Sequence, residues 1–367
     1  MRIRDSVARL GADEFGITLT ARDGMPRAHV VAERIRETLR LPFDQGITDL
    51  PVTASIGISL FPDDAPDAEA AVKYADTAMH QAKRAGRGTI RFFSPRMNSE
   101  ALARLELETA LRKAVDNGEF TLHYQPKMHV ESGTICGLEA LLRWERPGHG
   151  TVGPGDFVAV LEDTGLIVPV GRWVIAAACA QIAEWRASSI GPVAISVNVA
   201  GRQFIDGDLE RDVTDALRAH GIEPHLLELE LTESSLMANT ESTINMLTHL
   251  RNLGVGIFID DFGTGYSSLA YLRRFPVDKL KIDRAFIGGI TTNADDAAIV
   301  LAIIRMAHTL KLSVVAEGVE TEAQLDFLRM HDCAEIRGFY LSRPLARPQI
   351  EDMLLEFNRH LTADAPL

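Results

Sequence analysis

Apolar and polar positions along the chain repeat with two different periods, which predict strands and helices. In the first 93 residues, alternation predicts strands at Gly16–Leu19 and Val52–Leu60. Spacings of three and four predict helices at Ala28–Leu41 and Ala68–Ala85. A long amphipathic helix at Asn98–Asn117 follows, and we expect it to connect two domains.

From Phe120 onward the predicted strands and helices alternate. The predicted strands are Thr121–Gln125, Ile135–Trp144, Val193–Val199, Leu226–Leu231, Val255–Asp260, Lys279–Asp283, Ser313–Ala316 and Glu335–Leu341. The predicted helices include Trp173–Arg186, Leu209–His220, Ser242–Leu253, Asp295–Leu310 and Glu322–Met330. About eight strands with intervening helices indicate an α/β fold of the TIM-like β/α-barrel type, because parallel strands need crossover helices. A doubly wound open sheet is the alternative, because periodicity does not distinguish an open sheet from a closed one.

Composition and charge narrow the function classes. A chain of 367 residues with 46% hydrophobic and 24% charged residues fits a globular protein of two domains. The formal net charge of −13 argues against binding to duplex nucleic acid or to a membrane surface. No signal peptide and no apolar run of spanning length is evident. Three widely separated cysteines, without a CxxC pair, predict a reduced, cytoplasmic setting.

Charged or amide side chains occur within or directly after six consecutive predicted strands. They are Glu139 and Arg143, Asn198, Glu230 and Glu233, Asp260 and Asp261, Lys281 and Asp283, and Glu317 and Glu320. Helix capping explains some of these individually, since carboxylates favour the first turn of a helix. It does not explain the set, because Glu139 and Asn198 lie inside their apolar runs. In a β/α barrel such side chains would converge at the carboxyl ends of the strands.

The adjacent carboxylates Asp260 and Asp261 repel each other unless a cation compensates. Hard divalent cations prefer oxygen ligands, and Glu139, Asn198, Glu230 and Asp260 supply such a set. Asp261 and Glu317 would hold a second ion, with Asp260 bridging the two, as in sites for phosphoryl displacement. Lys281 would orient or deprotonate a water, or stabilise phosphate charge. Histidine is nearly absent from the set, so magnesium or manganese is favoured over zinc.

Several motifs in register resemble the EAL domain over about residues 105–360. They are YQPK, GLEALLRWE, SVNVA, LELTES, DDFGTGYSSL, KIDRAFI, AEGVET and GFYLSRP. EAL domains are β/α-barrel phosphodiesterases that hydrolyse cyclic di-GMP to linear pGpG. The resemblance therefore implies a metal-dependent hydrolase of bacterial signalling. The helical pattern that precedes it predicts a linker helix over residues 96–118, leading into the barrel. The resemblance also implies a homodimer. The expected location is the cytoplasm, either for the chain by itself or as the cytoplasmic part of a longer, membrane-anchored sensor.

The resemblance also implies roles for individual residues. Glu139, Asn198, Glu230 and Asp260 match ligands of the first ion, and Asp261 points to the second. Glu317 matches a metal- or water-coordinating glutamate, and Lys281 matches the lysine that holds the catalytic water. Gln125, Arg143, Asp283 and Arg337 match substrate contacts. Glu233 matches the companion of Glu230, and Glu320, Thr264 and Gly265 match residues that support the loop after the paired aspartates, Phe262–Leu269. Arg337 departs from the family, which usually has glutamine there, and a tolerated substitution is the favoured interpretation.

Residues 1–95 resemble the C-terminal part of a GGDEF, or diguanylate cyclase, domain. The segment RLGADEFG carries the signature as Gly11, Ala12, Asp13, Glu14 and Phe15, with Ala12 in place of the second glycine. Arg2 and Asp5 have the spacing of an RxxD product-inhibition site. A methyl group at Ala12 disfavours close backbone approach to GTP phosphates. No counterpart of the first strand of that domain is recognisable, so we expect a degenerate domain without cyclase activity.

Two hypotheses for the second domain follow. The leading one is hydrolysis of cyclic di-GMP, based on the complete ligand set, Lys281 and the intact loop. The alternative is a non-catalytic receptor that binds cyclic di-GMP and signals through a partner, motivated by Arg337 and the altered GGDEF segment.

Overall fold

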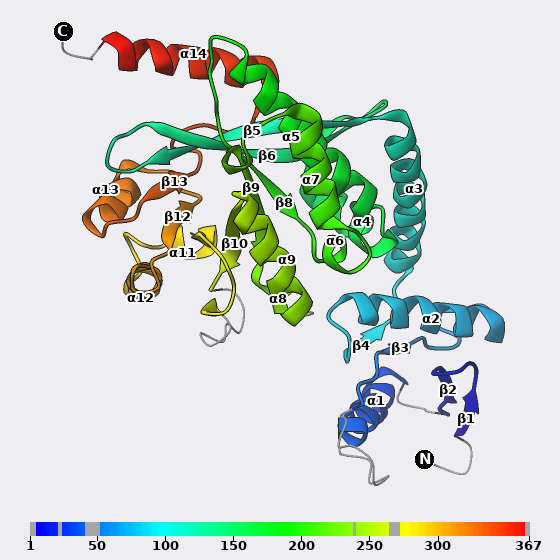
Figure 1. Ribbon diagram of the computed structural model, residues 1–367. Helices are drawn as coiled ribbons and strands as arrows, with labels where there is room; N and C mark the ends of the chain where they lie inside the picture. The colour runs from blue at the N-terminus through cyan, green and yellow to red at the C-terminus, as the bar shows by residue number, and fades with distance from the viewer. Residues whose placement is uncertain (1–4, 21–23, 41–51, 238–239, 264–271, 364–367) are drawn as a thin grey trace. The chain divides into compact units, whose positions relative to one another are not determined.

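The computed structural model describes residues 5–20, 24–40, 52–237, 240–263 and 272–363 (Figure 1). The chain forms two compact units, Met1–Leu107 and Glu108–Leu367, which are described separately. Helix α3, Pro95–Asn117, contains the boundary between them.

The first unit is built from short strands and two helices. Strands β1 (Ser6–Arg9) and β2 (Phe15–Thr18) pair antiparallel, and helix α1 (Gly24–Arg40) follows. Strand β3 (Ile56–Ile58) pairs in parallel with β4 (Ile90–Phe92), and helix α2 (Ala68–Arg84) connects them. The predicted helices of this unit are confirmed, whereas β1 and β4 were not predicted because runs of three or four residues carry little periodic signal.

Helix α3 was predicted to be amphipathic, and this is wrong. Leu111 and Ala114 are fully buried, whereas Leu102 and Leu105 are 59% and 60% exposed. Leu111 lies six residues after Leu105, so these leucines do not share one face of a helix with 3.6 residues per turn.

The second unit contains a closed barrel of eight strands (Figure 1). In spatial order they are β5 (Phe120–His129), β13 (Glu335–Arg337), β12 (Ser313–Glu317), β11 (Lys279–Ile282), β10 (Gly256–Phe262), β9 (Leu227–Thr232), β8 (Ile195–Val199) and β6 (Ile135–Arg146). Pairing of β5 with β6 closes the barrel, so the alternative of an open sheet is wrong and the predicted barrel is confirmed. Strands β7 (Gly150–Val152) and β14 (Leu345–Ala346) extend the sheet.

Strand β5 departs from the expected all-parallel arrangement. It runs antiparallel to both of its barrel neighbours, β6 and β13. The reason is local, because only residues 130–134 separate β5 from β6. A connection this short forms a hairpin, whereas a parallel pair needs a crossover of a dozen or more residues.

Helices surround the barrel and bury the outward-facing side chains of its strands. They are α4 (Val158–Thr164), α5 (Ile167–Arg186), α6 (Gly201–Ile205), α7 (Leu209–His220), α8 (Glu233–Met237), α9 (Thr240–Leu253), α11 (Arg284–Ile287), α12 (Ala294–Thr309), α13 (Glu322–Met330) and α14 (Arg347–Ala363). Single 3₁₀ turns occupy Pro154–Asp156 and Pro224–Leu226. The core between strands and helices is mainly aliphatic, as in Leu229, Leu280 and Val314, which are completely buried.

Helix α5 is, among the described residues, the one helix that is long and apolar enough to span a bilayer by length and composition. The expectation that no stretch reaches that length was therefore too strict. Half of its most apolar window is buried inside the unit, and Val170, Ile175 and Ile182 pack into the core. This burial is typical of a core helix of a globular domain.

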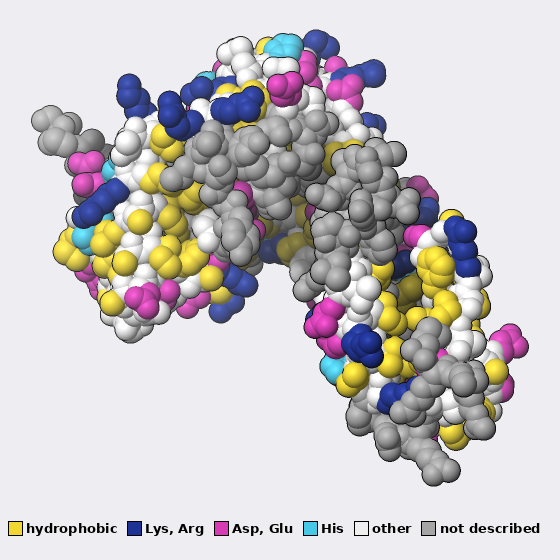
Figure 2. Space-filling view, turned by 90° about the horizontal axis from the view of Figure 1, so that it is seen from below, with side chains coloured by type: hydrophobic (Ala, Val, Ile, Leu, Met, Phe, Trp, Pro, Cys, Tyr) yellow, Lys and Arg dark blue, Asp and Glu magenta, His cyan; other side chains and the backbone are white. Residues whose placement is uncertain are grey.

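Figure 2 shows one face of the molecule, on which Lys and Arg side chains are interspersed with Asp and Glu.

Candidate active site

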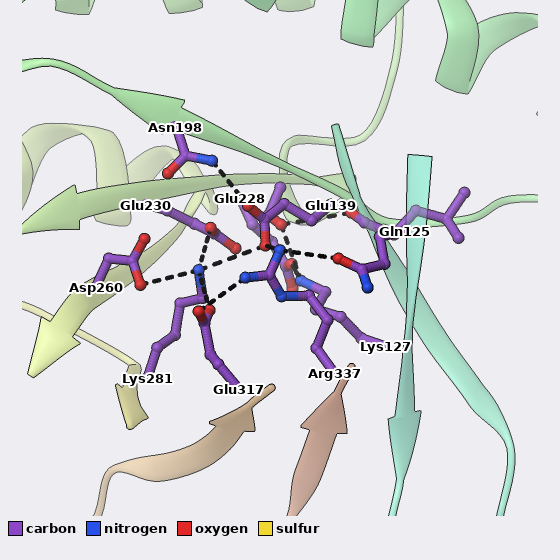
Figure 3. A network of polar contacts seen from close by, with 12 residues as sticks. Gln125, Lys127, Glu139, Asn198, Glu228, Glu230, Asp260, Lys281, Glu317 and Arg337 are labelled. Atoms are coloured by element: carbon purple, nitrogen blue, oxygen red, sulfur yellow. Dashed lines mark hydrogen bonds and ion pairs between the residues drawn. The ribbon is translucent and has the colours of Figure 1, made fainter. Parts of the chain in front are cut away.

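The predicted polar residues converge inside the barrel, toward the carboxyl ends of the parallel strands. Four buried carboxylates from four strands surround one lysine (Figure 3). They are Glu139 of β6, Glu230 of β9, Asp260 of β10 and Glu317 of β12, and we refer to them as the carboxylate ring.

Strand alternation explains why these residues point inward. In β9 the leucines Leu227, Leu229 and Leu231 are completely buried, and Glu228 and Glu230 occupy the positions between them. Successive side chains of a strand point to opposite faces, so the leucines face the helices and the glutamates face the barrel interior. Strand β11 repeats the pattern, with Leu280 and Ile282 outward and Lys281 inward.

Lys281 is fully buried and contacts every member of the carboxylate ring. Its Nζ lies 2.5 Å from Glu317 Oε1, 3.1 Å from Asp260 Oδ1 and 3.5 Å from Glu139 Oε2. It also forms an ion pair with Glu230 Oε2. Burial would lower the pKa of Lys281, but the four carboxylates raise it well above its usual value, so the side chain is an ammonium.

Arg337 of β13 supplies a second cation. It lies directly opposite Glu317 in the β12–β13 pairing. Its Nη2 is 2.7 Å from Glu317 Oε2, and its Nη1 forms an ion pair with Glu139 Oε2. Nη1 also donates a hydrogen bond of 3.3 Å to Gln125 Oε1 (Figure 3). Gln125 in turn donates to the backbone oxygen of Ser342 at 3.0 Å.

The carboxylates of the ring have unequal proton affinities. Burial raises the pKa of Glu139 against the opposing effect of Arg337. Burial also raises the pKa of Asp260 to about 7, assisted by the neighbouring Glu317 and Glu230. At Glu230, burial acts in the same direction, but Lys281 and Lys127 outweigh it and lower the pKa to about 2. The ring therefore contains a permanent carboxylate, Glu230, and a group that titrates near neutrality, Asp260.

Asn198 and Asp261 lie at the exposed rim of the ring. Asn198 of β8 donates from Nδ2 to Glu139 Oε1 at 2.9 Å. Asp261 has a left-handed backbone, with φ of 54°, and its amide donates to Asp260 Oδ1 at 2.9 Å. Burial and a hydrogen bond with Asp283 raise the pKa of the Asp261 carboxyl. Asp283 also caps α11, accepting from the amide of Ala285 at 2.8 Å.

Some predicted residues do not contact the ring in the described structure. Arg143 is half-buried on β6 and donates to the backbone oxygen of Leu142 at 2.9 Å. Glu233 begins α8, where its buried Oε2 has no hydrogen-bond partner among the described residues. Glu320 is exposed, and its backbone amide donates to Gln324 Oε1. Thr264 and Gly265 lie outside the described residues.

The predicted GGDEF signature lies in the turn between β1 and β2. The amides of Leu10 and Gly11 donate to the oxygen of Glu14 at 2.8 and 3.2 Å, and Arg9 donates to the oxygen of Ala12 at 2.7 Å. Asp13 and Phe15 follow in the same hairpin. Asp5 forms an ion pair of 3.0 Å with Arg27, whereas Arg2 lies outside the described residues.

Sequence analysis missed a second charged layer deeper in the barrel. Lys127 of β5 is buried, forms an ion pair with Glu228 and donates to Ser196 Oγ at 3.2 Å. Lys279 is 2.7 Å from Glu335. The ammonium groups of Lys127 and Lys279 lie 5.0 and 4.6 Å from the centroid of the phenyl group of Phe258. A signal was present, because Glu228 and Lys279 lie two residues before Glu230 and Lys281 and share their inward face.

The donor set fits a hard divalent cation. Glu230 Oε1 is buried and has no hydrogen-bond partner among the described residues, although its side chain lies in the middle of the ring. An unpaired carboxylate oxygen in such a place is costly unless a cation meets it. Glu139 and Asp260 add carboxylate oxygens, and Asn198 adds an amide, which is the ligand chemistry that magnesium and manganese prefer.

Comparison with known families gives two matches along the chain. The EAL domain matches residues 108–344, and the diguanylate cyclase, GGDEF domain matches residues 1–89. The predicted resemblance to an EAL domain preceded by a GGDEF segment is thus confirmed.

Individual relatives agree with the family matches. The bifunctional diguanylate cyclase/cyclic di-GMP phosphodiesterase MucR of Pseudomonas aeruginosa is 43% identical over 95% of this chain and 51% of its own length. The cyclic di-GMP phosphodiesterase PdeR of Escherichia coli is 39% identical over 92% of this chain and 51% of its own length. The chain spans about half the length of these curated relatives.

A solved structure, the PaMucR phosphodiesterase in complex with c-di-GMP, matches the second unit. It is 47% identical and covers 67% of this chain and 99% of that chain, with a TM-score of 0.64. An EAL enzyme, Bd1971, solved with cAMP and cyclic di-GMP bound, covers 70% of each chain at 33% identity and a TM-score of 0.66.

Proposed function

This chain belongs to the EAL domain family, and from that premise we propose that it hydrolyses cyclic di-GMP to linear pGpG. The observation that carries the proposal is the carboxylate ring around Lys281, four acidic side chains from four strands at one end of a barrel. The relatives named as cyclic di-GMP phosphodiesterases, and the solved complex with c-di-GMP, support this substrate.

The carboxylate ring, together with Asn198 and Asp261 at its rim, would hold magnesium or manganese, in two ions. Glu139, Asn198, Glu230 and Asp260 would bind the first ion, and Asp261 and Glu317 the second, with Asp260 between them. Such ions, when bound, lower the pKa of water and neutralise charge on the phosphate. The unpaired Glu230 Oε1 supports this assignment.

The side chains of the ring have separate tasks in the hydrolysis. Water attacks one phosphorus and gives up a proton, the bond from that phosphorus to a ribose 3′-oxygen breaks, and the departing oxygen takes up a proton. Because Lys281 is held as an ammonium, it donates hydrogen bonds and stabilises negative charge rather than accepting the proton of water. Glu139 and Glu317, which contact Lys281, hold that ammonium in the ring.

Substrate would bind above the ring. Arg143 lies two inward positions beyond Glu139 on β6 and would contact a phosphate. Gln125 and Asp283 would contact the rest of the nucleotide. Arg337 donates a hydrogen bond to Gln125 and would therefore lie beside the bound nucleotide. Glu233, Glu320, Thr264 and Gly265 would support the loop after the paired aspartates. A homodimer formed by this domain completes the proposal, and light scattering on the purified chain tests it, because a monomeric mass would contradict it.

One observation favours the alternative of a non-catalytic receptor. Arg337 pairs with both Glu139 and Glu317, two of the proposed ligands. A chain in which these pairs persist would bind cyclic di-GMP and release it unchanged.

Product analysis distinguishes the two functions. The purified chain is incubated with cyclic di-GMP and magnesium or manganese, with and without EDTA, and the nucleotides are separated by chromatography. We expect pGpG in the presence of metal and unchanged substrate with EDTA. Tight binding without product in either metal would contradict the proposed hydrolysis and support a receptor.

A further inference from the structure

Arg337 occupies a position that gives the ring a cation of its own. Its neighbours in the pairing of β13 are Glu317 on one side and Lys127 on the other, so its side chain points into the barrel. The side chain is only 14% exposed, and its guanidinium lies between Glu139, Glu317 and Gln125 (Figure 3).

The contacts of Arg337 use oxygens that a metal ion would also use. Both oxygens of Glu317 are engaged, Oε1 by Lys281 and Oε2 by Arg337. Both oxygens of Glu139 are engaged as well, Oε1 by Asn198 and Oε2 by Arg337 and Lys281. Glu230 Oε1 and Glu317 Oε1 both have no hydrogen-bond partner among the described residues, although Glu317 Oε1 forms the ion pair with Lys281. A metal ion that binds Glu139 or Glu317 would therefore compete with cations that already contact these carboxylates.

The net charge of the carboxylate ring also indicates that Arg337 competes with a metal ion. The four carboxylates of the ring face two permanent cations, Lys281 and Arg337, so the ring is less negative than it would be with a neutral residue at position 337. Arginine stays charged inside proteins, so its competition ends only when the guanidinium moves away. Lysine in its place would contact the carboxylates as a point charge, without the fork that bridges two of them.

We propose that Arg337 is a resident cation that competes with divalent metal for Glu139 and Glu317, so that this chain binds its metal more weakly than the same chain with glutamine at position 337. The inference deepens the proposed function and rests on the ring being a metal site. The same pairs stabilise the metal-free ring, because Arg337 compensates carboxylates that would otherwise repel each other in a buried place.

Titration with Mn²⁺ tests this inference without any substrate. The EDTA-treated, dialysed full chain is titrated with Mn²⁺, and free Mn²⁺ is measured by electron paramagnetic resonance; thermal unfolding is followed in parallel. The variants are Arg337→Gln, Arg337→Lys and the control Arg329→Gln. The control substitution also removes one positive charge, but it does so on α13, where Arg329 pairs with Asp326 at the surface.

The expected result is a Kd for Mn²⁺ that is about 10- to 100-fold lower in Arg337→Gln, from the loss of one unit charge beside the ions. The metal-free Tm of this variant should fall by about 5 °C or more, and added Mn²⁺ should raise it further than in the unmodified chain. Arg329→Gln should change neither quantity. An unchanged or higher Kd in Arg337→Gln would overturn the proposal.

Arg337→Lys keeps the inference testable if the glutamine variant does not fold. A lysine bridges the two glutamates less well, so its Kd for Mn²⁺ should fall between the values of the other two chains. A folded lysine variant that binds Mn²⁺ no more tightly than the unmodified chain would overturn the proposal. Hydrolysis is assayed separately: Mn²⁺ affinity that responds to position 337 without pGpG formation would contradict only the proposed function.

Discussion

At the scale of single residues, the buried carboxylates of the ring are unequal, and this determines what each can do. Glu230, with its pKa lowered to about 2, is a carboxylate at any pH near neutrality. Asp260, with its pKa raised to about 7, is half protonated there when no metal is bound. Metal would have to displace the proton of Asp260 but none from Glu230, so metal binding should strengthen as pH rises toward and above 7.

Asp260→Asn tests the raised pKa through stability. Because the folded metal-free chain holds the Asp260 proton up to about pH 7 and the unfolded chain releases it near pH 4, stability from this group falls as pH rises between those values. We expect the free energy of unfolding of the unmodified chain, relative to Asp260→Asn, to drop by roughly 2–3 kcal/mol between pH 5 and pH 7. Urea unfolding in EDTA measures it, and a difference independent of pH would contradict the assignment.

At the scale of elements, strand β13 positions Arg337 opposite Glu317, and the next residue, Gly338, allows the close approach that this requires. A Cβ on Gly338 would meet the backbone of Val319, including its carbonyl carbon at 2.7 Å, closer than real Cβ atoms come. The amide of Val319 donates to the oxygen of Arg337 at 3.2 Å, so the two backbones are held together at this point.

Gly338→Ala should therefore displace β13 from β12. We expect a loss of about 1–3 kcal/mol in the free energy of unfolding, because backbone atoms must move, and at least a tenfold loss of cyclic di-GMP hydrolysis. Gly153→Ala is the control, since Gly153 has φ of −80° and no atom within 4 Å of an added Cβ. Equal activity and stability in the two variants would refute this role for β13.

The periodic pattern was sufficient for the barrel strands and for the inward residues near their ends. Polar side chains at the carboxyl ends of parallel strands meet at one end of a barrel, and that is why Lys281 and Glu230 were found together. The pattern does not give contacts across the barrel, such as the one between Lys281 and Glu139, which are 142 residues apart in sequence. Two features of β5 were not predicted: its antiparallel orientation, and the buried charged layer that its Lys127 forms with Glu228. The hairpin was not recognised from its short turn, and its buried lysine resembled a surface residue.

At the scale of the whole molecule, the two units match different families, which have opposite activities toward the same nucleotide. The first unit carries Ala12 in the turn between β1 and β2, where the GGDEF signature has glycine. The second unit carries the full carboxylate ring. We therefore propose hydrolysis for the second unit and expect no synthesis by the first.

Incubation with GTP tests the assignment of the first unit. We expect no cyclic di-GMP and no pGpG after incubation of the full chain with GTP and magnesium or manganese, because the methyl group of Ala12 obstructs close approach of the backbone to phosphates. Including the Glu139→Gln variant prevents hydrolysis from hiding any product. Cyclic di-GMP formed by that variant would contradict the assignment.

The most direct test of the central claim compares Glu139→Gln with the unmodified chain in one assay. Both are incubated with cyclic di-GMP and manganese, pGpG is quantified, and thermal unfolding confirms that both are folded. Glutamine keeps the shape of the side chain but removes the charge that would bind metal and hold Lys281. We expect pGpG from the unmodified chain and at least a hundredfold less from Glu139→Gln. Equal rates of hydrolysis in the two proteins would show that the chemistry takes place somewhere other than the carboxylate ring.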